Sequence, residues 1–283
     1  MSRLGPSLRE LLQEPGIVVA MGAHDGLGAR LAERAGFRAL YHGSYAAASA
    51  HGLPDIGLIG LGETAANLRR VASSCALPVI ADADTGYGDE VAVAHTVREL
   101  ERAGASAVQL EDQVWPKRCG HMPGKEVVPV DEMVLKVRAA VAARDPETVI
   151  IARTDALQMR GLDEALARCA AYAEAGADIV FVDAPQDREQ LAAAASRVGA
   201  PAMANMVETG VTPLLPVAEL EALGFALVIF PASHVWAMAG AYRRLADAIR
   251  ADGSTAAVRG DMLSFAETNE VLGLGALRPE AVA

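Results

Sequence analysis

One segment recurs four times along the chain, and it constrains the fold more than any other feature. In each copy a helical stretch stops at a glycine, and a short apolar run follows one to three residues later; the copies span residues 31–42, 100–112, 172–184 and 220–233. Glycine accepts the left-handed backbone conformation that ends a helix, and the run after it has the length of a buried strand. Each copy therefore predicts a helix that leads into a strand.

Four more apolar runs complete the pattern, at residues 16–21, 78–84, 148–155 and 201–208. Eight strands that alternate with helices in about 250 residues have the size of a (β/α)8 barrel, whose parallel strands are joined by right-handed crossovers. We therefore predict an α/β fold of the TIM-barrel type. A doubly wound open sheet is the alternative, but no GxGxxG motif follows the first run, and GAHDG after Met21 is a poor match.

The domain organisation follows from the absence of any linker, charge block or low-complexity segment in the sequence. We expect one barrel domain, residues 1–260, with a lid loop at 113–128, and a C-terminal helical tail, residues 261–283. A net charge of −11 argues against a nucleic-acid or anionic-membrane partner. The apolar stretch 225–242 is interrupted by Pro231, Ser233 and His234, so we expect no membrane span. Three scattered cysteines without CxxC spacing favour the cytoplasm.

Polar side chains follow most of the predicted strands, at the end where barrels of this type carry their active sites. These residues are Gly43, Ser44, Asp82, Asp84, Glu111, Asp112, Arg153, Asp155, Asp183, Asn205 and Glu208. So many carboxylates on one rim would repel each other unless a cation lay among them. Since no histidine or cysteine cluster accompanies them, magnesium or manganese suits the site better than zinc. A single Asp is more commonly a helix cap, so the prediction rests on the whole set.

A long polar loop, residues 113–128, separates the fourth strand from its helix. Loops of this length without periodicity of their own commonly act as lids or binding loops. Within it Lys117, Arg118 and His121 surround Cys119. Neighbouring cations lower the pKa of a thiol and make it a usable acid or base near neutral pH. The alternative, a buried cysteine that serves as a small hydrophobe, is disfavoured by the three basic neighbours.

The motifs KRCGH (117–121), LEDQ (110–113) and DADTGYG (82–88) resemble those of the phosphoenolpyruvate mutase/isocitrate lyase superfamily. The similarity continues through GLPD (52–55), IIARTD (150–155), NMVE (205–208) and SFAE (264–267), and so covers nearly the whole chain. Within that superfamily the KRCGH type of loop marks the lyase branch. The resemblance thus implies a barrel enzyme that cleaves a carbon–carbon bond.

For the metal, the resemblance implies Mg²⁺, replaceable by Mn²⁺, near Asp84, with Asp55, Asp82 and Glu111 in the surrounding shell. The implied reaction cleaves a 2-hydroxy di- or tricarboxylate, similar to 2-methylisocitrate or 2,3-dimethylmalate, into a 2-oxo acid such as pyruvate and a carboxylic acid. In such chemistry the metal lowers the pKa of the 2-hydroxyl group. The carbanion that leaves is stabilised by its own carboxylate.

For the substrate, the residues implied are Gly43, Ser44, Tyr45, Arg153, Asp183 and Asn205. Gly43, Ser44 and Arg153 are expected to hold the 2-oxo acid fragment, and Asn205 to face the other half. Two of the set depart from the usual family pattern, because Tyr45 stands where glycine is common and Asp183 where many lyases have glutamate. Tyr45 is expected to narrow the pocket and Asp183 to shorten the reach to the metal's water shell.

For the proton transfer, Cys119 carries over as the catalytic acid, on a loop that closes over the ligand. Arg118 and His121 are expected to offset the charge of the carbanion, with Lys117 and Arg153 completing the catalytic set. The expected partner is a small anionic carboxylate, and the expected assembly is a homo-oligomer, a dimer or tetramer, because this family exchanges its last helix between subunits.

Three other functions compete with the lyase. One is phosphorus–carbon bond chemistry on a carboxyphosphonoenolpyruvate-like substrate. Another is decarboxylation of a 2-oxo acid such as oxaloacetate, which does not need a thiol acid and is therefore disfavoured by KRCGH. The last is a non-catalytic binding protein, which we would expect to have lost the rim acids or Cys119.

Overall fold

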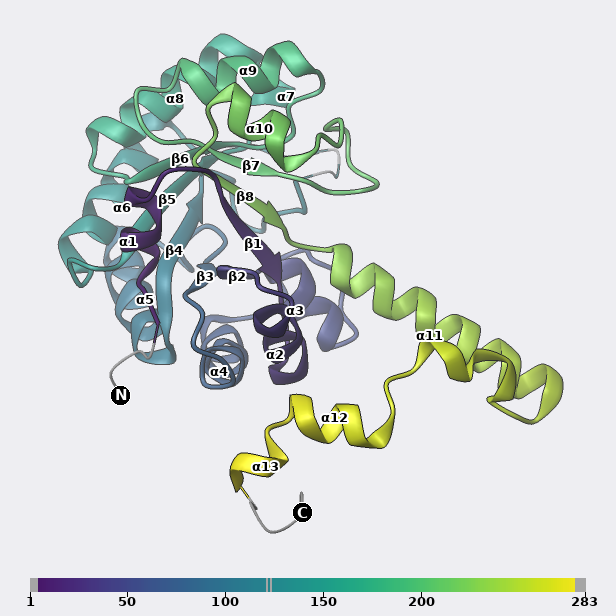
Figure 1. Ribbon diagram of the computed structural model, residues 1–283. Coiled ribbons are helices and arrows are strands. Elements are labelled where there is room, and N and C mark those ends of the chain that lie inside the picture. Colours follow the sequence, from purple (N-terminus) through teal and green to yellow (C-terminus); the bar gives the residue numbers. More distant parts are fainter. Residues whose placement is uncertain (1–4, 121, 123, 278–283) are drawn as a thin grey trace.

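The computed structural model describes residues 5–120, 122 and 124–277, and its centre is an eight-stranded parallel sheet (Figure 1). The strands are β1 (Val18–Gly22), β2 (Ala39–His42), β3 (Val79–Asp82), β4 (Ala105–Glu111), β5 (Val149–Thr154), β6 (Ile179–Val182), β7 (Met203–Asn205) and β8 (Leu227–Phe230). Hydrogen-bonded neighbours run in the order β6-β5-β4-β3-β2-β1-β8-β7. A parallel bridge between Val180 and Ala202 connects the two ends, and the predicted TIM-type barrel is confirmed.

The described helices include those that alternate with the strands and cover the outside of the barrel (Figure 1). They are α1 (Leu8–Gln13), α2 (Gly26–Arg34), α3 (Ser44–Ala50), α4 (Leu61–Ala72), α5 (Glu90–Ala103), α6 (Val130–Ala143), α7 (Leu157–Arg160), α8 (Leu162–Glu174), α9 (Arg188–Ser196), α10 (Val217–Leu223), α11 (Ser233–Asp252), the 3-10 helix η1 (Ala256–Asp261), α12 (Phe265–Val271) and α13 (Leu274–Leu277). None of these described helices is long and apolar enough to cross a membrane.

The glycines of the repeated segment end their helices as predicted. Gly36, Gly104, Gly176 and Gly224 follow α2, α5, α8 and α10, with φ angles of 85°, 107°, 104° and 102°. A side chain is strained in this left-handed region, and glycine is not. The chain therefore turns directly from each helix into the next strand, and strands far apart in sequence enter the barrel from the same end.

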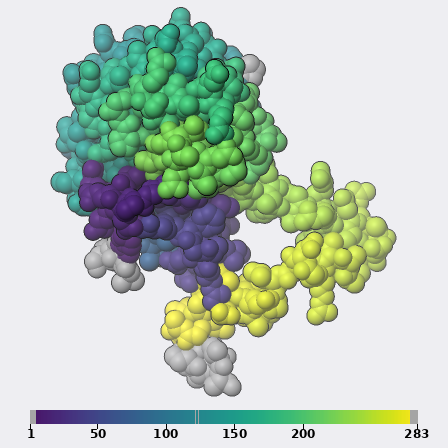
Figure 2. Space-filling model, turned by 45° about the horizontal axis from the view of Figure 1, so that its top comes forward, coloured from purple at the N-terminus to yellow at the C-terminus, as the bar shows by residue number. Residues whose placement is uncertain are grey.

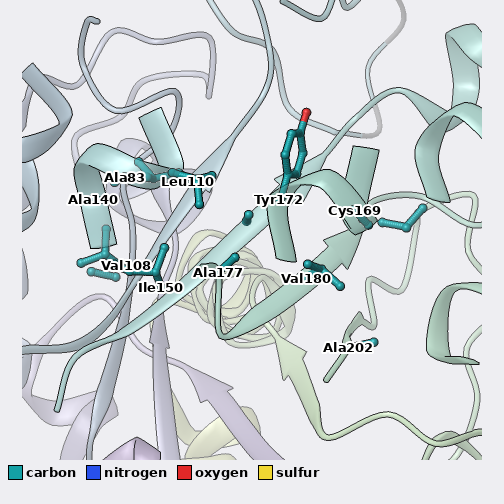
Figure 3. Close-up of a cluster of buried hydrophobic side chains, with 14 of the residues drawn as sticks. Ala83, Val108, Leu110, Ala140, Ile150, Cys169, Tyr172, Ala177, Val180 and Ala202 are labelled. Atoms are coloured by element: carbon teal, nitrogen blue, oxygen red, sulfur yellow. The ribbon is translucent and has the colours of Figure 1, made fainter. Parts of the chain in front are cut away.

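Two apolar layers stabilise the barrel. Inside it, alternate strand residues such as Ile80, Ile151 and Phe181 form one buried cluster, and Leu8 and Leu11 of α1 join that cluster. The other cluster lies between the sheet and the helices and is built mainly from alanine, valine and leucine (Figure 3). Because residues on both sheet faces are buried, the strands are apolar throughout rather than alternating, as in other parallel sheets.

The C-terminal part departs from the barrel. Helix α11 projects away from the body, and the chain then turns back, so that α12 lies beside α2 (Figures 1 and 2). Arg34 of α2 forms an ion pair of 2.5 Å with Glu270 of α12, and Arg30 donates to the carbonyl of Val271 at 3.3 Å. The tail is helical, as predicted, and in this single chain α12 packs on its own α2.

Candidate active site

A cavity opens at the carboxyl ends of the strands and gathers most of the predicted site residues. Those that line it are Gly43, Ser44, Tyr45, Asp55, Asp82, Glu111, Lys117, Arg118, Cys119, Arg153, Asp183 and Asn205. Asp84 is buried beside the cavity, and His121 lies outside the described residues. Residues that the sequence scatters over more than 160 positions, from Gly43 to Asn205, thus share one site.

Asp82, at the end of β3, is saturated by hydrogen bonds from its neighbours. Its Oδ2 accepts from the backbone N–H of Ser44 at 3.3 Å and from the Ser44 hydroxyl at 3.0 Å. Its Oδ1 accepts from the backbone N–H of Asp84 at 3.1 Å and from the amide of Gln109 at 3.3 Å. Asp82 therefore positions the turn after β2 and the turn that carries Asp84, and it has little capacity left for a direct metal bond.

Asp84 and Lys117 form the ionic centre of the site. The ammonium of Lys117 lies 2.8 Å from Asp84 Oδ1, contacts Asp55 as well, and donates to the Ser44 hydroxyl at 2.9 Å. Burial raises the pKa of Asp84 to about 6 although Lys117 opposes the rise. Burial alone would lower the pKa of Lys117, but the carboxylates of Asp84 and Asp55 outweigh it and raise that pKa. The ammonium therefore occupies a position where the protein stabilises positive charge.

Glu111, at the end of β4, completes the acidic group. Its Oε2 lies 3.4 Å from the Arg153 guanidinium, whereas its buried Oε1 has no hydrogen-bond partner among the described residues. Burial raises the pKa of Glu111 well above its ordinary value, and Arg153 opposes that rise. An unsatisfied buried carboxylate oxygen is unfavourable unless a cation or water reaches it.

These oxygens test whether magnesium fits the site. Within residues 5–120, 122 and 124–277, no group of three or more His, Cys, Asp and Glu side chains converges closely enough to hold a metal alone. Magnesium keeps several of its waters and commonly takes one or two protein carboxylates. The charged pocket around Asp84 and the unpartnered oxygen of Glu111 fit an ion bound in that way, and they do not fit a metal enclosed by protein ligands.

Arg153, at the end of β5, is held in one orientation. Its Nε and Nη2 donate to Asp155 at 2.8 Å each, and Nη2 also donates to Asp183 Oδ2 at 2.8 Å. The guanidinium carbon lies 5.4 Å from the centre of the Phe181 ring, and Asn205 donates to Asp183 Oδ1 at 3.4 Å. A guanidinium fixed by two carboxylates is a rigid cation for a substrate carboxylate.

The described residues of the loop 113–128 lie over this cluster. The Gln113 side chain bonds both the N–H and the carbonyl of Arg118, and Lys125 donates to the carbonyl of Gly120 and, at 2.9 Å, to Asp155. A Cβ on Gly120 would lie 1.9 Å from Asp183 Oδ2. The loop backbone therefore lies directly on the carboxylate, and Cys119 beside it lines the cavity half-buried.

Sequence reasoning missed Lys125, which is 5% exposed and anchors the loop. It also missed Trp236, in the first turn of α11, whose indole N–H donates to the Tyr45 hydroxyl at 2.9 Å. The two rings meet edge to face with centroids 5.9 Å apart. Trp236 is one of two tryptophans in the chain, which was the only available signal for it.

Asp112 and Glu208, two of the acids predicted at the strand ends, do not line the cavity. Asp112 accepts from Thr154 at 2.7 Å, Tyr172 at 2.8 Å and Arg168 at 3.1 Å. It therefore joins β4 to β5 and α8 beneath the site. Glu208, after β7, is exposed and is not among the lining residues.

Comparison with known proteins agrees with this geometry. A family profile described as phosphoenolpyruvate phosphomutase matches residues 8–250. The chain is 46% identical to the 2,3-dimethylmalate lyase of Eubacterium barkeri over 96% of the chain and 94% of that protein. It is 41% identical to the 2-methylisocitrate lyase of Bacillus subtilis over 89% of the chain and 83% of that protein.

The chain also superposes closely on solved structures of other enzymes. Oxaloacetate acetylhydrolase in complex with 3,3-difluorooxalacetate superposes with a TM-score of 0.91 at 36% identity, covering 98% of this chain and 95% of that one. Phosphonopyruvate hydrolase in complex with oxalate and Mg²⁺ superposes with a TM-score of 0.86 at 34% identity, covering 97% of this chain and 96% of that one.

Proposed function

The chain belongs to the phosphoenolpyruvate mutase/isocitrate lyase superfamily, and from that premise we propose how its cavity cleaves a 2-hydroxy carboxylic acid. The protein is a carbon–carbon lyase, as its relatives are. The proposed reaction converts a 2-hydroxy di- or tricarboxylate into a 2-oxo acid such as pyruvate and a carboxylic acid. The observation that carries the proposal is that Cys119 and the rim carboxylates line a single cavity under a closed loop.

Superfamily members generally depend on magnesium, and the phosphonopyruvate hydrolase neighbour was solved with it. We propose that Asp84 and Glu111 hold Mg²⁺ here, largely through water, with Asp55 nearby and Asp82 as the residue that positions Asp84. Manganese has the same ligand preference and is the proposed substitute. When bound, such an ion lowers the pKa of the substrate's 2-hydroxyl group and stabilises negative charge on its oxygen.

The residues of the chain then bind and orient the substrate. Gly43 and Ser44, at the start of α3, are proposed to bind the carboxylate of the 2-oxo acid fragment, and Ser44 does so by redirecting the donors that contact Asp82 in this structure. The fixed guanidinium of Arg153 neutralises the same fragment, and Asn205 faces the other half. The support for these roles is that all four residues line the cavity and that Arg153 is immobilised by Asp155 and Asp183.

Cleavage releases a carbanion that must receive a proton. We assign that proton to the Cys119 thiol, with Arg118 offsetting the negative charge, and Lys117 and His121 as further cationic residues of the loop. The closed loop supports this assignment, because it keeps bulk water from the reacting carbon. Its backbone at Gly120 lies against Asp183, which fixes Cys119 on the edge of the cavity.

The proposed assembly is a dimer or tetramer in which the last helix is exchanged between subunits. Large apolar side chains on α11 and α12 support it, since Met238 and Tyr242 of α11 are 51% and 72% exposed and Phe265 of α12 is 86% exposed. Exposed apolar surface of this kind marks interfaces. The widely spaced cysteines support a cytoplasmic location. Light scattering on the eluted protein tests the assembly, and a monomer at micromolar concentration contradicts it.

The reaction is tested by incubating the protein and Mg²⁺ with 2,3-dimethylmalate, 2-methylisocitrate, isocitrate and oxaloacetate, while pyruvate and glyoxylate are measured. We expect pyruvate from at least one of the first two acids and no turnover after chelation of divalent cations. Full activity in excess chelator, or turnover of oxaloacetate alone, would contradict the proposal.

A further inference from the structure

The cavity is divided by charge into two halves. Among the described lining residues, every Asp, Glu, Lys and Arg lies between positions 55 and 183 of the chain. Most of these residues lie at the ends of β3 to β6 or in the loop after β4, and Asp55 belongs to the segment between β2 and β3. The lining residues after β7 and β8 are uncharged, and they include Val207, Thr209, Pro231 and Trp236.

Apart from Asp55, which pairs with Lys117 of the charged group, the strand order places these two groups on separate sides of the barrel mouth. Strands β6, β5, β4 and β3 are consecutive neighbours in the sheet, whereas β2, β1, β8 and β7 form the other half. Tyr45, in the first turn of α3 after β2, therefore lies on the uncharged side, where it meets Trp236 from the segment after β8. We refer to Tyr45, Val207, Pro231 and Trp236 as the apolar wall.

The apolar wall is held rigidly. The Trp236 indole N–H is already bonded to the Tyr45 hydroxyl at 2.9 Å, and the adjacent Val235 is 7% exposed and anchors the first turn of α11. Two half-buried aromatic rings in edge-to-face contact present an apolar surface of fixed shape. The indole N–H is thus oriented toward Tyr45 and not toward a ligand.

Two of the cations on the charged side are matched by carboxylates of the protein. Lys117 is paired with Asp84 and Asp55, and Arg153 with Asp155 and Asp183. A malate-type substrate has two carboxylates, one on each side of the reacting bond, and the proposed function places one at Gly43, Ser44 and Arg153 and the other towards Asn205. The remaining substituent on C3 then points to the apolar wall. Among the described residues the apolar wall holds no cation, so a third carboxylate there would be buried unpaired, which is strongly unfavourable, whereas an alkyl group gains from burial.

Resting on the proposed lyase function, we propose that the substrate is a 2-hydroxy dicarboxylate with an uncharged alkyl group on C3, and that Tyr45 and Trp236 exclude tricarboxylates. The cleavage balances without any co-reactant: the C2–C3 bond breaks, the hydroxyl proton leaves as the 2-oxo group forms, and C3 gains one proton. 2,3-Dimethylmalate gives pyruvate and propionate, and 2-methylisocitrate gives pyruvate and succinate.

Because both acids release pyruvate, one assay compares them. We expect kcat/KM for 2,3-dimethylmalate to exceed that for 2-methylisocitrate by a factor on the order of 10² or more, the scale at which an unpaired buried charge discriminates. Comparable values, or a preference for the tricarboxylate, would overturn the inference while leaving the lyase function intact.

Trp236→Arg adds a cation to the apolar wall. It should lower the ratio of kcat/KM for 2,3-dimethylmalate to that for 2-methylisocitrate by a factor of about ten or more, because the third carboxylate then gains a partner. Trp236→Phe is the matched control, since it keeps an apolar ring, and it should retain the preference for the dicarboxylate. An unchanged ratio in a folded Trp236→Arg protein counts against the wall as the determinant.

If neither acid yields pyruvate, the lyase function fails, and the inference is judged by calorimetric binding of the same two acids in the presence of Mg²⁺. Tighter binding of 2,3-dimethylmalate supports the apolar wall as the selective element. Equal or tighter binding of 2-methylisocitrate overturns it.

Discussion

Replacing Lys117 by Met should strongly destabilise the protein in the absence of divalent cations. The ammonium of Lys117 lies 2.8 Å from Asp84 Oδ1, and the two side chains are 3% and 2% exposed. Removing one partner of such a buried pair costs about 3–5 kcal/mol, because the other charge remains buried and uncompensated. At roughly 2–4 °C per kcal/mol for a domain of this size, the Tm should fall by about 6–20 °C.

Magnesium should restore part of this loss, because an ion at Asp84 supplies the missing positive charge. A ligand at a hundred times its Kd stabilises a protein by about 2.7 kcal/mol, and the Lys117→Met protein should gain more from it than the wild type, since no ammonium competes for Asp84. Scanning calorimetry in chelator and in saturating magnesium chloride measures both effects.

Lys125→Met is the matched control. Lys125 forms an equally buried ion pair of 2.9 Å with Asp155, away from Asp84. This variant should also lose stability, but magnesium should raise its Tm no more than it raises that of the wild type. The reasoning is refuted if Lys117→Met keeps the wild-type Tm in chelator, or if magnesium stabilises it no better than Lys125→Met.

Three further perturbations test the loop and the contact between His24 and His234, whose ring centroids lie 5.1 Å apart. Cys119→Ser should lower cleavage by a factor on the order of 10² to 10⁴ without changing pyruvate affinity, and near-normal turnover would remove Cys119 from the mechanism. Gly120→Ala should reduce kcat/KM while the Tm is retained, because its Cβ would lie 1.9 Å from Asp183 Oδ2 and hold the loop open. Burial and the neighbouring His24 lower the pKa of His234 to about 4, below that of an unfolded histidine. The unfolded state therefore binds the extra proton first as the pH falls below about 6.5, and stability should decrease by about 2 kcal/mol between pH 7 and 5. In urea unfolding, the loss of stability between pH 7 and 5 should be smaller for His234→Phe than for the wild type. Equal losses would contradict the role of His234 in this pH dependence.

Local patterns in the sequence were sufficient for the fold. The helix–glycine–strand segment is decided by nearby residues, since a left-handed glycine ends a helix wherever it occurs, and Gly36, Gly104, Gly176 and Gly224 all adopt that conformation. Together with the four other predicted strands, the four copies of this segment make eight strand–helix units, which have one common way to bury a parallel sheet on both faces. For the same reason the strand ends could be listed as site candidates, and most of them line the cavity.

What the sequence left open were contacts across the barrel. The sequence predicted a metal near Asp84 with Asp82 in the surrounding shell, but not that hydrogen bonds saturate Asp82 or that Asp84 faces the Lys117 ammonium. Trp236 and Tyr45 are 191 positions apart, and no local pattern relates them.

Local patterns cannot predict these contacts, because barrel closure brings side chains together according to strand order, and this order is a property of the whole chain. Residue types alone determined that this protein would have an acidic rim with a cysteine loop. Only the tertiary structure decided which carboxylates carry hydrogen bonds, which cation lies among them, and that the lining residues after β7 and β8 are uncharged.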